Sequence, residues 1–534
     1  MDETALTQIN DAPEAVSGKS STVALSLVLC LYVAARLWRL TASCLWFDEI
    51  FSVHAARHEW GRMLGFVAAD LIHPPLFYAL LKLWMGAGGD SLLWLRLFPV
   101  VISVAAVVPF LLLARELKLR ASETNLALLL AATNGYLIKY AQEVRMYSLL
   151  LFLALCSLWL FVRLFKRAGA SRANSAALFA VNLLLVFTHY YGWLVVSAEA
   201  LFLLFKARRK LKGFLLAVAA LLLCFVPWIY AVLKAKDEGA GLAQNIGWAA
   251  RPSAADVVQF LTLLHQPFYF RQSLNDPPYV RLSAPLALLV FGLPVALLAW
   301  NFLRRGARDA GTERANDARW LFAFFVFTVA FVFAASHLLP HSIWGTRHLI
   351  IVAAPYIIFA SVALNRLRAA WLKTTLLIVL GCWLLLAATV SVVRREPVYI
   401  WCAWENLAAQ MTADEAAAHQ TPTVYAFEDL VAYHLWFASQ TKAEPRFNVV
   451  VVKNIPGLKE DPAYFLPRRF DGVQSGDIGA LEGEQFWVAF RDASWDETRP
   501  PLNILKAKGY RAEKVFDASA QGQHAFLVLL RRGS

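Results

Sequence analysis

The sequence predicts an α-helical polytopic membrane protein with a small C-terminal α/β domain outside the membrane. Hydrophobic types make up 59% of the 534 residues and charged types only 17%, whereas soluble domains are roughly 45–50% apolar and about 25% charged. The formal charge of +13 would suggest nucleic-acid binding in a soluble protein. In a membrane protein it indicates basic cytoplasmic loops, so we expect no nucleic-acid partner.

Apolar runs of about 17–25 residues are candidate spanning helices, because backbone polar groups in lipid must be satisfied within the segment. A further apolar segment, 73–87, is shorter, and Lys82 lies near its middle. We expect a re-entrant or juxtamembrane helix there rather than another span. The eleven predicted spans lie near residues 21–41, 92–114, 123–140, 147–165, 174–189, 190–206, 213–233, 283–303, 320–339, 347–366 and 373–393.

Basic residues cluster in alternate loops, and the positive-inside rule places these loops in the cytoplasm. Residues 1–20 then form a cytoplasmic N-terminal tail, 21–395 a transmembrane domain with an external loop at 42–91, and 396–534 an extracytoplasmic domain. The first apolar run is expected to be an uncleaved anchor, since its flank is not basic. The clusters are Arg115, Lys118, Arg120; Lys166, Arg167, Arg172; Lys206, Arg208, Arg209, Lys210, Lys212; Arg304, Arg305, Arg308, Arg314, Arg319; and Arg366, Arg368, Lys373.

Polar and turn residues return after residue 394. Strands are predicted at 423–427, 446–452, 484–490 and 525–530, and helices at 404–418, 429–439 and 501–508. Strands that alternate with helices indicate an α/β domain. The sequence shows no nucleotide-binding glycine loop and no zinc-type cysteine spacing.

With this orientation, the unusual polar residues gather on the external side. Ionisable groups at membrane depth are costly and suggest a functional site. Cations there could hold a lipid phosphate while a carboxylate transfers a proton. Asp48 and Glu49 are adjacent, so on a helix their side chains diverge by about 100° and only one can point at a reacting hydroxyl. The plainer interpretation is a pair of acids that favours a helix N-terminus.

Glu143, Arg145 and Tyr147 form a second external group, in which Glu143 and Tyr147 would share a helix face and Arg145 would point elsewhere. Snorkelling to the lipid headgroups is the alternative. Three further candidates each have a structural alternative as well. Arg347 could be a membrane anchor. His73 precedes two prolines, so its role could be limited to the entry of the chain into a helix. His189 also lies at a predicted helix end.

Three further features have weaker expectations. Residues 253–265 begin with a capping-box pattern and read as an interfacial helix, or equally as one packed on the bundle. Glu199 is expected to form hydrogen bonds within the bundle. Cys44 and Cys402 are both predicted to be external, which leaves a disulfide between them open.

Four motifs carry a family resemblance. In chain order they are Trp46-Phe47-Asp48-Glu49, His73-Pro74-Pro75-Leu76, the run 140–149 with Gln-Glu-Val-Arg-Met-Tyr, and Thr188-His189-Tyr190-Tyr191-Gly192. Over residues 20–395 the chain resembles bacterial GT-C glycosyltransferases, which belong with the dolichyl-phosphate-mannose–protein mannosyltransferases and the lipid A aminoarabinose transferases. The resemblance implies a GT-C-like fold and an inverting transfer from a polyprenyl-phosphate sugar.

By this resemblance, Asp48 is the general base, completed by Glu49, and Arg347 contacts the lipid phosphate. His73, Glu143, Arg145, Tyr147 and His189 are the other expected substrate-binding residues. No cofactor is required. The aminoarabinose transferases have a metal-binding glutamate near the start of the segment that begins here at His73. Because of this substitution, binding of a divalent metal is possible, but the sequence does not support it. The expected partners are the lipid-linked donor, membrane lipid and a glycolipid, glycan or protein acceptor, at the outer face of a bacterial inner membrane.

Two rival functions remain. A transporter or flippase usually has its ionisable residues and broken helices near the bilayer midplane, whereas most of those here lie at predicted external helix ends. A non-catalytic scaffold that presents the C-terminal domain would not require Asp48, Glu143 and Arg347 to converge.

Overall fold

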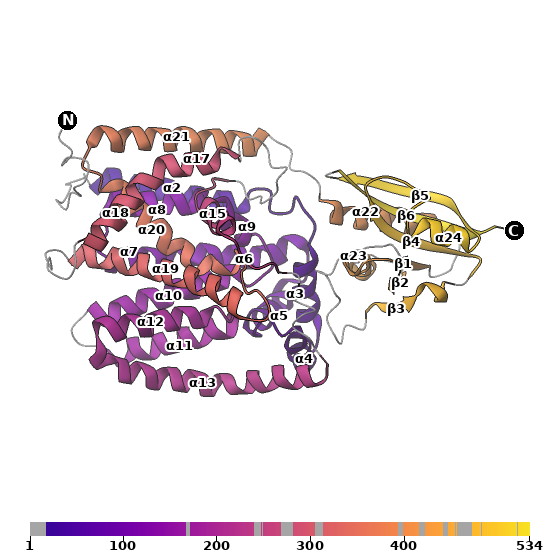
Figure 1. The fold of residues 1–534 in the computed structure, drawn as a ribbon, viewed down its shortest axis with the longest axis horizontal. Helices are drawn as coiled ribbons and strands as arrows, with labels where there is room; N and C mark the ends of the chain where they lie inside the picture. Colours follow the sequence, from indigo (N-terminus) through magenta and orange to yellow (C-terminus); the bar gives the residue numbers. More distant parts are fainter. Residues whose placement is uncertain are drawn as a thin grey trace.

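The computed structural model describes residues 18–166, 171–239, 249–268, 281–304, 313–393, 399–415, 422–441, 447–453, 472–481, 483–520 and 522–533, together with residues 247 and 455. A bundle of long helices fills one end of the molecule, and a domain with a β-sheet lies at the other end (Figure 1). The predicted fold class is therefore confirmed. Most of the predicted N-terminal tail and the basic residues Arg167, Arg305 and Arg308 lie outside the described residues.

Each predicted span is helical along most of its length. Asn134 interrupts the third of them, where its side chain accepts a hydrogen bond from the N–H of Leu137 and so begins a new helix. The helices of the bundle are α2 (Gly18–Leu37), α6 (Leu92–Ala105), α7 (Val107–Glu116), α8 (Ala121–Thr133), α9 (Gly135–Ala141), α10 (Tyr147–Lys166), α11 (Arg172–Thr188), α12 (Gly192–Lys206), α13 (Arg208–Asp237), α17 (Ser283–Ala287), η1 (Leu288–Gly292), α18 (Leu293–Arg304), α19 (Glu313–Leu338), η2 (His348–Val352), α20 (Ala353–Asn365) and α21 (Ala370–Val393).

Among the described residues, seven helices are long and apolar enough to cross a membrane: Leu92–Glu116, Tyr147–Phe165, Arg208–Asp237, Ser283–Trp300, Arg319–Leu338, His348–Asn365 and Ala370–Val393. The other four predicted spans fall outside this set. The apolar part of α2 is Thr22–Leu37, α11 and α12 have 17 and 15 residues, and Asn134 divides the remaining span into α8 and α9. The span count of eleven thus stays a prediction.

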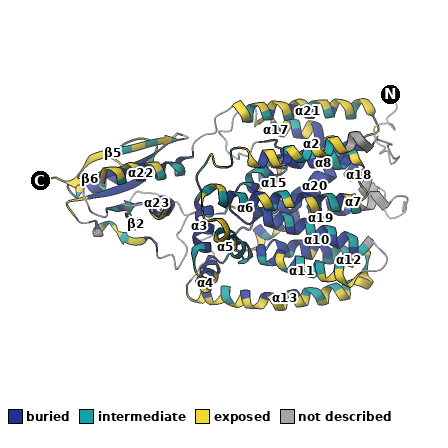
Figure 2. Ribbon diagram, turned by 180° about the vertical axis from the view of Figure 1, so that it is seen from behind, coloured by how far each residue is buried: buried dark blue, intermediate teal, exposed yellow. Residues whose placement is uncertain are grey.

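Burial separates central from peripheral helices (Figure 2). In the span His348–Asn365, 94% of the apolar stretch is buried inside the protein, whereas in Ala370–Val393 this share is only 22%. Leu223 on α13 and Leu385 on α21 remain 73% and 70% exposed. Apolar side chains on the outside of such a bundle are the surface that lipid would cover.

Three short helices cover the end of the bundle that faces the C-terminal domain: α3 (Phe47–Arg57), α4 (Trp60–Asp70) and α5 (Leu76–Gly88) (Figure 1). The last is the predicted re-entrant or juxtamembrane helix. Its 13 residues would extend about 20 Å, too little for a hydrocarbon core of about 30 Å. Lys82 donates to the carbonyl oxygen of His58 at 2.7 Å, so its charge lies against the α3–α4 turn. The predicted capping box begins α15 (Ala254–Leu263).

The C-terminal domain contains a six-stranded sheet in the order β3-β2-β1-β4-β6-β5. The strands β3, β2, β1 and β4 are parallel to one another. β6 runs antiparallel to both of its neighbours, β4 and β5. Alternate residues of β4 face opposite cores: Trp487 joins the side with α22 and α23, and Val488 the side with α24. The elements are η3 (Ile400–Cys402), α22 (Ala403–Glu415), β1 (Thr423–Ala426), α23 (Asp429–Thr441), β2 (Asn448–Lys453), β3 (Gln474–Asp477), η4 (Ile478–Ala480), β4 (Gln485–Asp492), α24 (Leu502–Ala507), β5 (Tyr510–Ala520) and β6 (Gln523–Arg532).

Candidate active site

Asp48 lies in the first turn of α3, beside a cation from a distant part of the chain. Its Oδ2 accepts a hydrogen bond from Arg347 Nη1 at 2.9 Å. Its backbone carbonyl accepts one from Arg145 at 3.2 Å. Burial alone would raise the pKa of Asp48, but the charges of Arg145 and Arg347 outweigh this effect and hold the pKa below its usual value. Asp48 is therefore an ionised carboxylate with a guanidinium against it.

Glu49 points away from Asp48, as the helical geometry predicts, and both of its oxygens are occupied. Oε1 accepts the N–H of Val144 at 2.9 Å, and Oε2 accepts the N–H of Trp46 at 3.0 Å. Arg96 Nη2 lies 3.3 Å from Oε2. Glu49 thus begins α3 as the acid of a capping box and also joins α3 to the segment before α10.

Residues 142–146 form a turn between α9 and α10, so the predicted helix through Glu143 and Tyr147 was wrong. The turn allows Glu143 and Arg145 to point in different directions from a compact segment. Glu143 Oε1 accepts a hydrogen bond from Trp46 Nε1 at 2.9 Å, and its Oε2 lies 3.7 Å from Lys139 Nζ. Glu143 therefore holds the residue before α3 rather than snorkelling outward.

Arg145 lies at the centre of the cluster and is 2% exposed. Its Nη1 donates to the hydroxyls of Ser52 and Tyr78 at 3.1 and 3.3 Å. Its Nη2 is 3.3 Å from Nε2 of His73. One guanidinium thus binds α3, α5 and the chain between α4 and α5.

Asp70 is a site residue that the sequence analysis missed. It ends α4 and lies 2.9 Å from Nδ1 of His73. Burial raises the pKa of Asp70 to about 7, against the opposing charge of Arg145. Burial and Arg145 both lower the pKa of His73, so its ring is neutral and its Nδ1–H donates to Asp70. An acid three residues before a histidine, at the end of an apolar helix, is the signal that could have found it.

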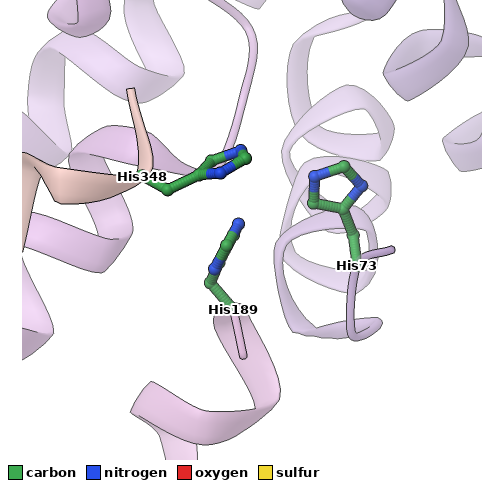
Figure 3. Close-up of side chains that lie close together, drawn as sticks. All are labelled: His73, His189 and His348. Atoms are coloured by element: carbon green, nitrogen blue, oxygen red, sulfur yellow. The ribbon is translucent and has the colours of Figure 1, made fainter. Parts of the chain in front are cut away.

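Three histidines converge at the site, His73, His189 and His348 (Figure 3), and His73 is the one in contact with Arg145. Their ring centroids are 5.5 Å apart for His73 and His189 and 4.6 Å apart for His189 and His348. His348, which was not among the predicted site residues, follows Arg347 directly and begins η2. Its position next to that arginine was the available signal.

The fit of a metal to this cluster depends on free nitrogen lone pairs. Candidate ligand atoms of the three rings lie within 4.8 Å of one another. However, Nδ1 of His189 accepts the N–H of Tyr191 at 3.1 Å, so in the neutral ring Nε2 holds the proton. Nε2 of His73 faces Arg145. The cluster as arranged therefore does not fit a cation, because the Nε2 lone pair of His73 is turned to a guanidinium and Nε2 of His189 holds a proton.

Tyr147 completes the group. It is fully buried, and in the part of the chain that the structure describes its hydroxyl has no hydrogen-bond partner, nor do Nε2 of His189 and Nε2 of His348. The ring of Tyr147 lies 6.2 Å from that of His348. All eight predicted residues thus belong to one connected cluster at the α3–α5 end of the bundle. Glu199, in contrast, binds Ser157 and Asn182 within the bundle, as expected.

No family model matches the sequence, and no curated protein matches it. Solved structures share its fold. ArnT from Cupriavidus metallidurans bound to undecaprenyl phosphate matches with a TM-score of 0.56 and 14% identity, over 96% of this chain and 98% of ArnT. Apo ArnT matches with a TM-score of 0.52 and 15% identity over the same shares. The oligosaccharyltransferase AglB from Archaeoglobus fulgidus, in complex with an inhibitory peptide and a dolichol-phosphate, has a TM-score of 0.48 and 13% identity, over 78% of this chain and 63% of AglB.

The chain is therefore a polytopic membrane protein with a GT-C-like fold. ArnT shares this fold over 96% of the chain. The resemblance drawn from the sequence motifs is confirmed at the level of the fold.

Proposed function

We propose that this protein is an inverting glycosyltransferase that moves a sugar from a polyprenyl-phosphate donor to an acceptor hydroxyl. The observation that carries the proposal is the ionised Asp48 carboxylate beside Arg347 and Arg145. A carboxylate and two cations are the groups that a proton transfer and a departing phosphate require. ArnT, which shares the fold, was solved with undecaprenyl phosphate bound.

The contacts support one sequence of bond changes. Asp48 accepts the proton of the acceptor hydroxyl as that oxygen bonds to the anomeric carbon. The bond from this carbon to the phosphate oxygen breaks on the opposite face, and its electron pair leaves with the lipid phosphate. Arg347 and Arg145 stabilise the negative charge that develops on the phosphate. The proton on Asp48 then passes to water.

The Asp48–Arg347 ion pair links binding of the donor phosphate to the basicity of Asp48. While Arg347 holds Asp48, the carboxylate is a weak base, because a neighbouring cation favours its ionised form. A phosphate that draws Arg347 toward itself would weaken this pair and raise the pKa of Asp48. Asp48 would thus become a better base only when the donor is bound.

The acceptor, a glycolipid, glycan or protein, and the placement of the site on the outer face of a bacterial inner membrane are part of the proposal. The basic clusters support this orientation. The alternative of a lipid or sugar transporter without transferase chemistry is less well supported, because α3 and α4, which carry Asp48 and Asp70, lie at one end of the bundle (Figure 1). The convergence of Asp48, Glu143 and Arg347 argues against a scaffold.

The test compares membrane lipids and glycans by mass spectrometry with and without the protein, and then measures transfer of a radiolabelled sugar from an undecaprenyl-phosphate donor in vesicles. We expect Asp48→Asn to abolish transfer and to bind undecaprenyl phosphate at least as tightly as the wild type, because Arg347 is then released from the ion pair. Asp90→Asn is the matched control, because Asp90 pairs with Arg57 at the surface. Wild-type turnover in the Asp48→Asn protein would refute the assignment of the base.

A further inference from the structure

The proposed reaction gives no role to the C-terminal domain, yet this domain contacts the helix that carries Asp48. Tyr433, Trp436 and Phe437 lie three and four positions apart on α23, so they share one helix face. They are 0%, 7% and 5% exposed. Figure 1 shows α23 on the side of the domain that faces α3.

Each of these rings meets a residue of α3. Tyr433 packs on Phe47 with ring centroids 4.8 Å apart. Trp436 packs on His54 at 4.7 Å, and Phe437 lies 5.2 Å from the guanidinium of Arg57. The three partners are seven and three positions apart, so they too share a face.

Asp48 follows Phe47 and is therefore turned about 100° from the α23 contact face, where it meets Arg347. Any rotation or shift of α3 on α23 would move the carboxylate relative to Arg347. The ring of Tyr433 packs on Phe47, the first residue of α3 and the neighbour of Asp48 in the chain.

A disulfide adds a covalent link at the same end of α3. Cys44 and Cys402 are bonded across 358 positions of sequence. Cys44 precedes α3 by three residues, and its carbonyl also accepts a hydrogen bond from Arg96 at 2.7 Å. The C-terminal domain thus holds α3 at its N-terminal approach through the disulfide and along one face through the rings.

We propose that the C-terminal domain is part of the transferase site, with Tyr433 as a positioning residue whose ring, together with the Cys44–Cys402 link, holds α3 so that Asp48 meets its substrate. This inference rests on the proposed function for its effect on turnover. The coupling of α23 to α3 does not depend on it.

The first experiment measures transfer by the full-length protein in vesicles. We expect Tyr433→Ala to lower kcat by about 10- to 100-fold, because a displacement of about 1 Å can cost 10²-fold. The donor KM and the affinity for undecaprenyl phosphate should change less than about threefold. Tyr433→Phe should restore turnover, since the ring carries the contact. Tyr510→Ala is the control, because Tyr510 is buried on the opposite side of the sheet.

Three outcomes would overturn the proposal: wild-type kcat in Tyr433→Ala, equal losses in Tyr433→Ala and Tyr510→Ala, or a Tyr433→Phe protein as impaired as Tyr433→Ala. The last would assign the effect to the hydroxyl instead of to positioning by the ring.

A second readout needs no activity. Hydrogen–deuterium exchange of peptides that cover α3 should increase in Tyr433→Ala, and more so when Cys44→Ser and Cys402→Ser are added, while exchange in α10 stays unchanged. If the wild type transfers no sugar but α3 still loses protection, the proposed function fails and the coupling stands. Unchanged exchange in α3 would refute the coupling itself.

Discussion

Arg347 Nη1 lies 2.9 Å from Asp48 Oδ2, although the two residues are 299 positions apart in the sequence. The ion pair joins the first turn of α3 to the segment before η2. In the resting protein, the charge of Arg347 offsets the negative charge of the ionised Asp48. The pair also keeps a cation where a departing phosphate would need one.

Arg347→Ala is expected to weaken undecaprenyl phosphate binding by about 10- to 100-fold, since a hydrogen bond to a charged group contributes about 1.5–3 kcal/mol. Arg347→Lys should recover part of the loss, because lysine keeps the charge but not the planar fork. Binding is measured by titration of the purified protein. Arg172→Ala, an exposed arginine on α11, is the control. Equal affinity in Arg347→Ala and Arg172→Ala would remove Arg347 from the phosphate site.

Asp70 should make stability depend on pH. Burial raises its pKa from 3.8 to about 7 in the folded protein, so the folded state holds a proton that the unfolded chain releases between these values. The free energy of unfolding therefore contains a contribution that decreases as pH rises from roughly 4 to 7 and is constant above. In Asp70→Asn this contribution should disappear. Thermal unfolding across this pH range, with Asp90→Asn as control, measures the difference, and parallel curves for wild type and Asp70→Asn would contradict the assignment.

Truncation of Glu49 should mainly reduce the stability of the protein, whereas truncation of Asp48 should mainly abolish its activity. Glu49→Ala leaves the backbone N–H groups of Trp46 and Val144 without their acceptor and removes the carboxylate that faces Arg96, so we expect it to lower the free energy of unfolding by about 3–5 kcal/mol. Asp48→Ala should cost much less stability while it abolishes transfer. Thermal unfolding of the two variants beside the transfer assay makes the comparison. A larger loss of stability in Asp48→Ala than in Glu49→Ala would reverse the two roles.

The proposed orientation predicts which positions a membrane-impermeant thiol reagent reaches. In a background with the four free cysteines replaced by serine, Asp90→Cys should be labelled in intact spheroplasts. Lys210→Cys should be labelled only after permeabilisation, because it lies in a predicted cytoplasmic cluster. Protection of Asp90→Cys and labelling of Lys210→Cys would place Asp48 on the inner face and refute the proposed external site.

Several elements were predictable because one local property determines them. The apolar runs became helices, and the central strands β1, β2, β4 and β6 were found as short apolar segments. The strands β3 and β5 were missed. Each lies at an edge of the sheet and exposes most of its residues, so neither has the apolar signal of a buried strand.

The site residues show the same division. Ionisable types at predicted helix ends singled out Asp48, Glu143, Arg145 and Arg347, because charge near a membrane is costly wherever it is placed. Their partners were not predictable in this way. Residues 142–146 were expected to be helical, and only the structure shows that their side chains bind the first residues of α3 and the residue before it.

The sequence alone determined the helical membrane class, the α/β character of the C-terminal domain and the residue types of the site, since hydrophobicity and charge act locally along the chain. Only the tertiary structure decided that Arg347 pairs with Asp48, that His348 joins two other histidines, and that Cys402 and Tyr433 hold α3. These contacts join segments that are close only after the helices have packed, and no local pattern specifies which buried groups then become neighbours.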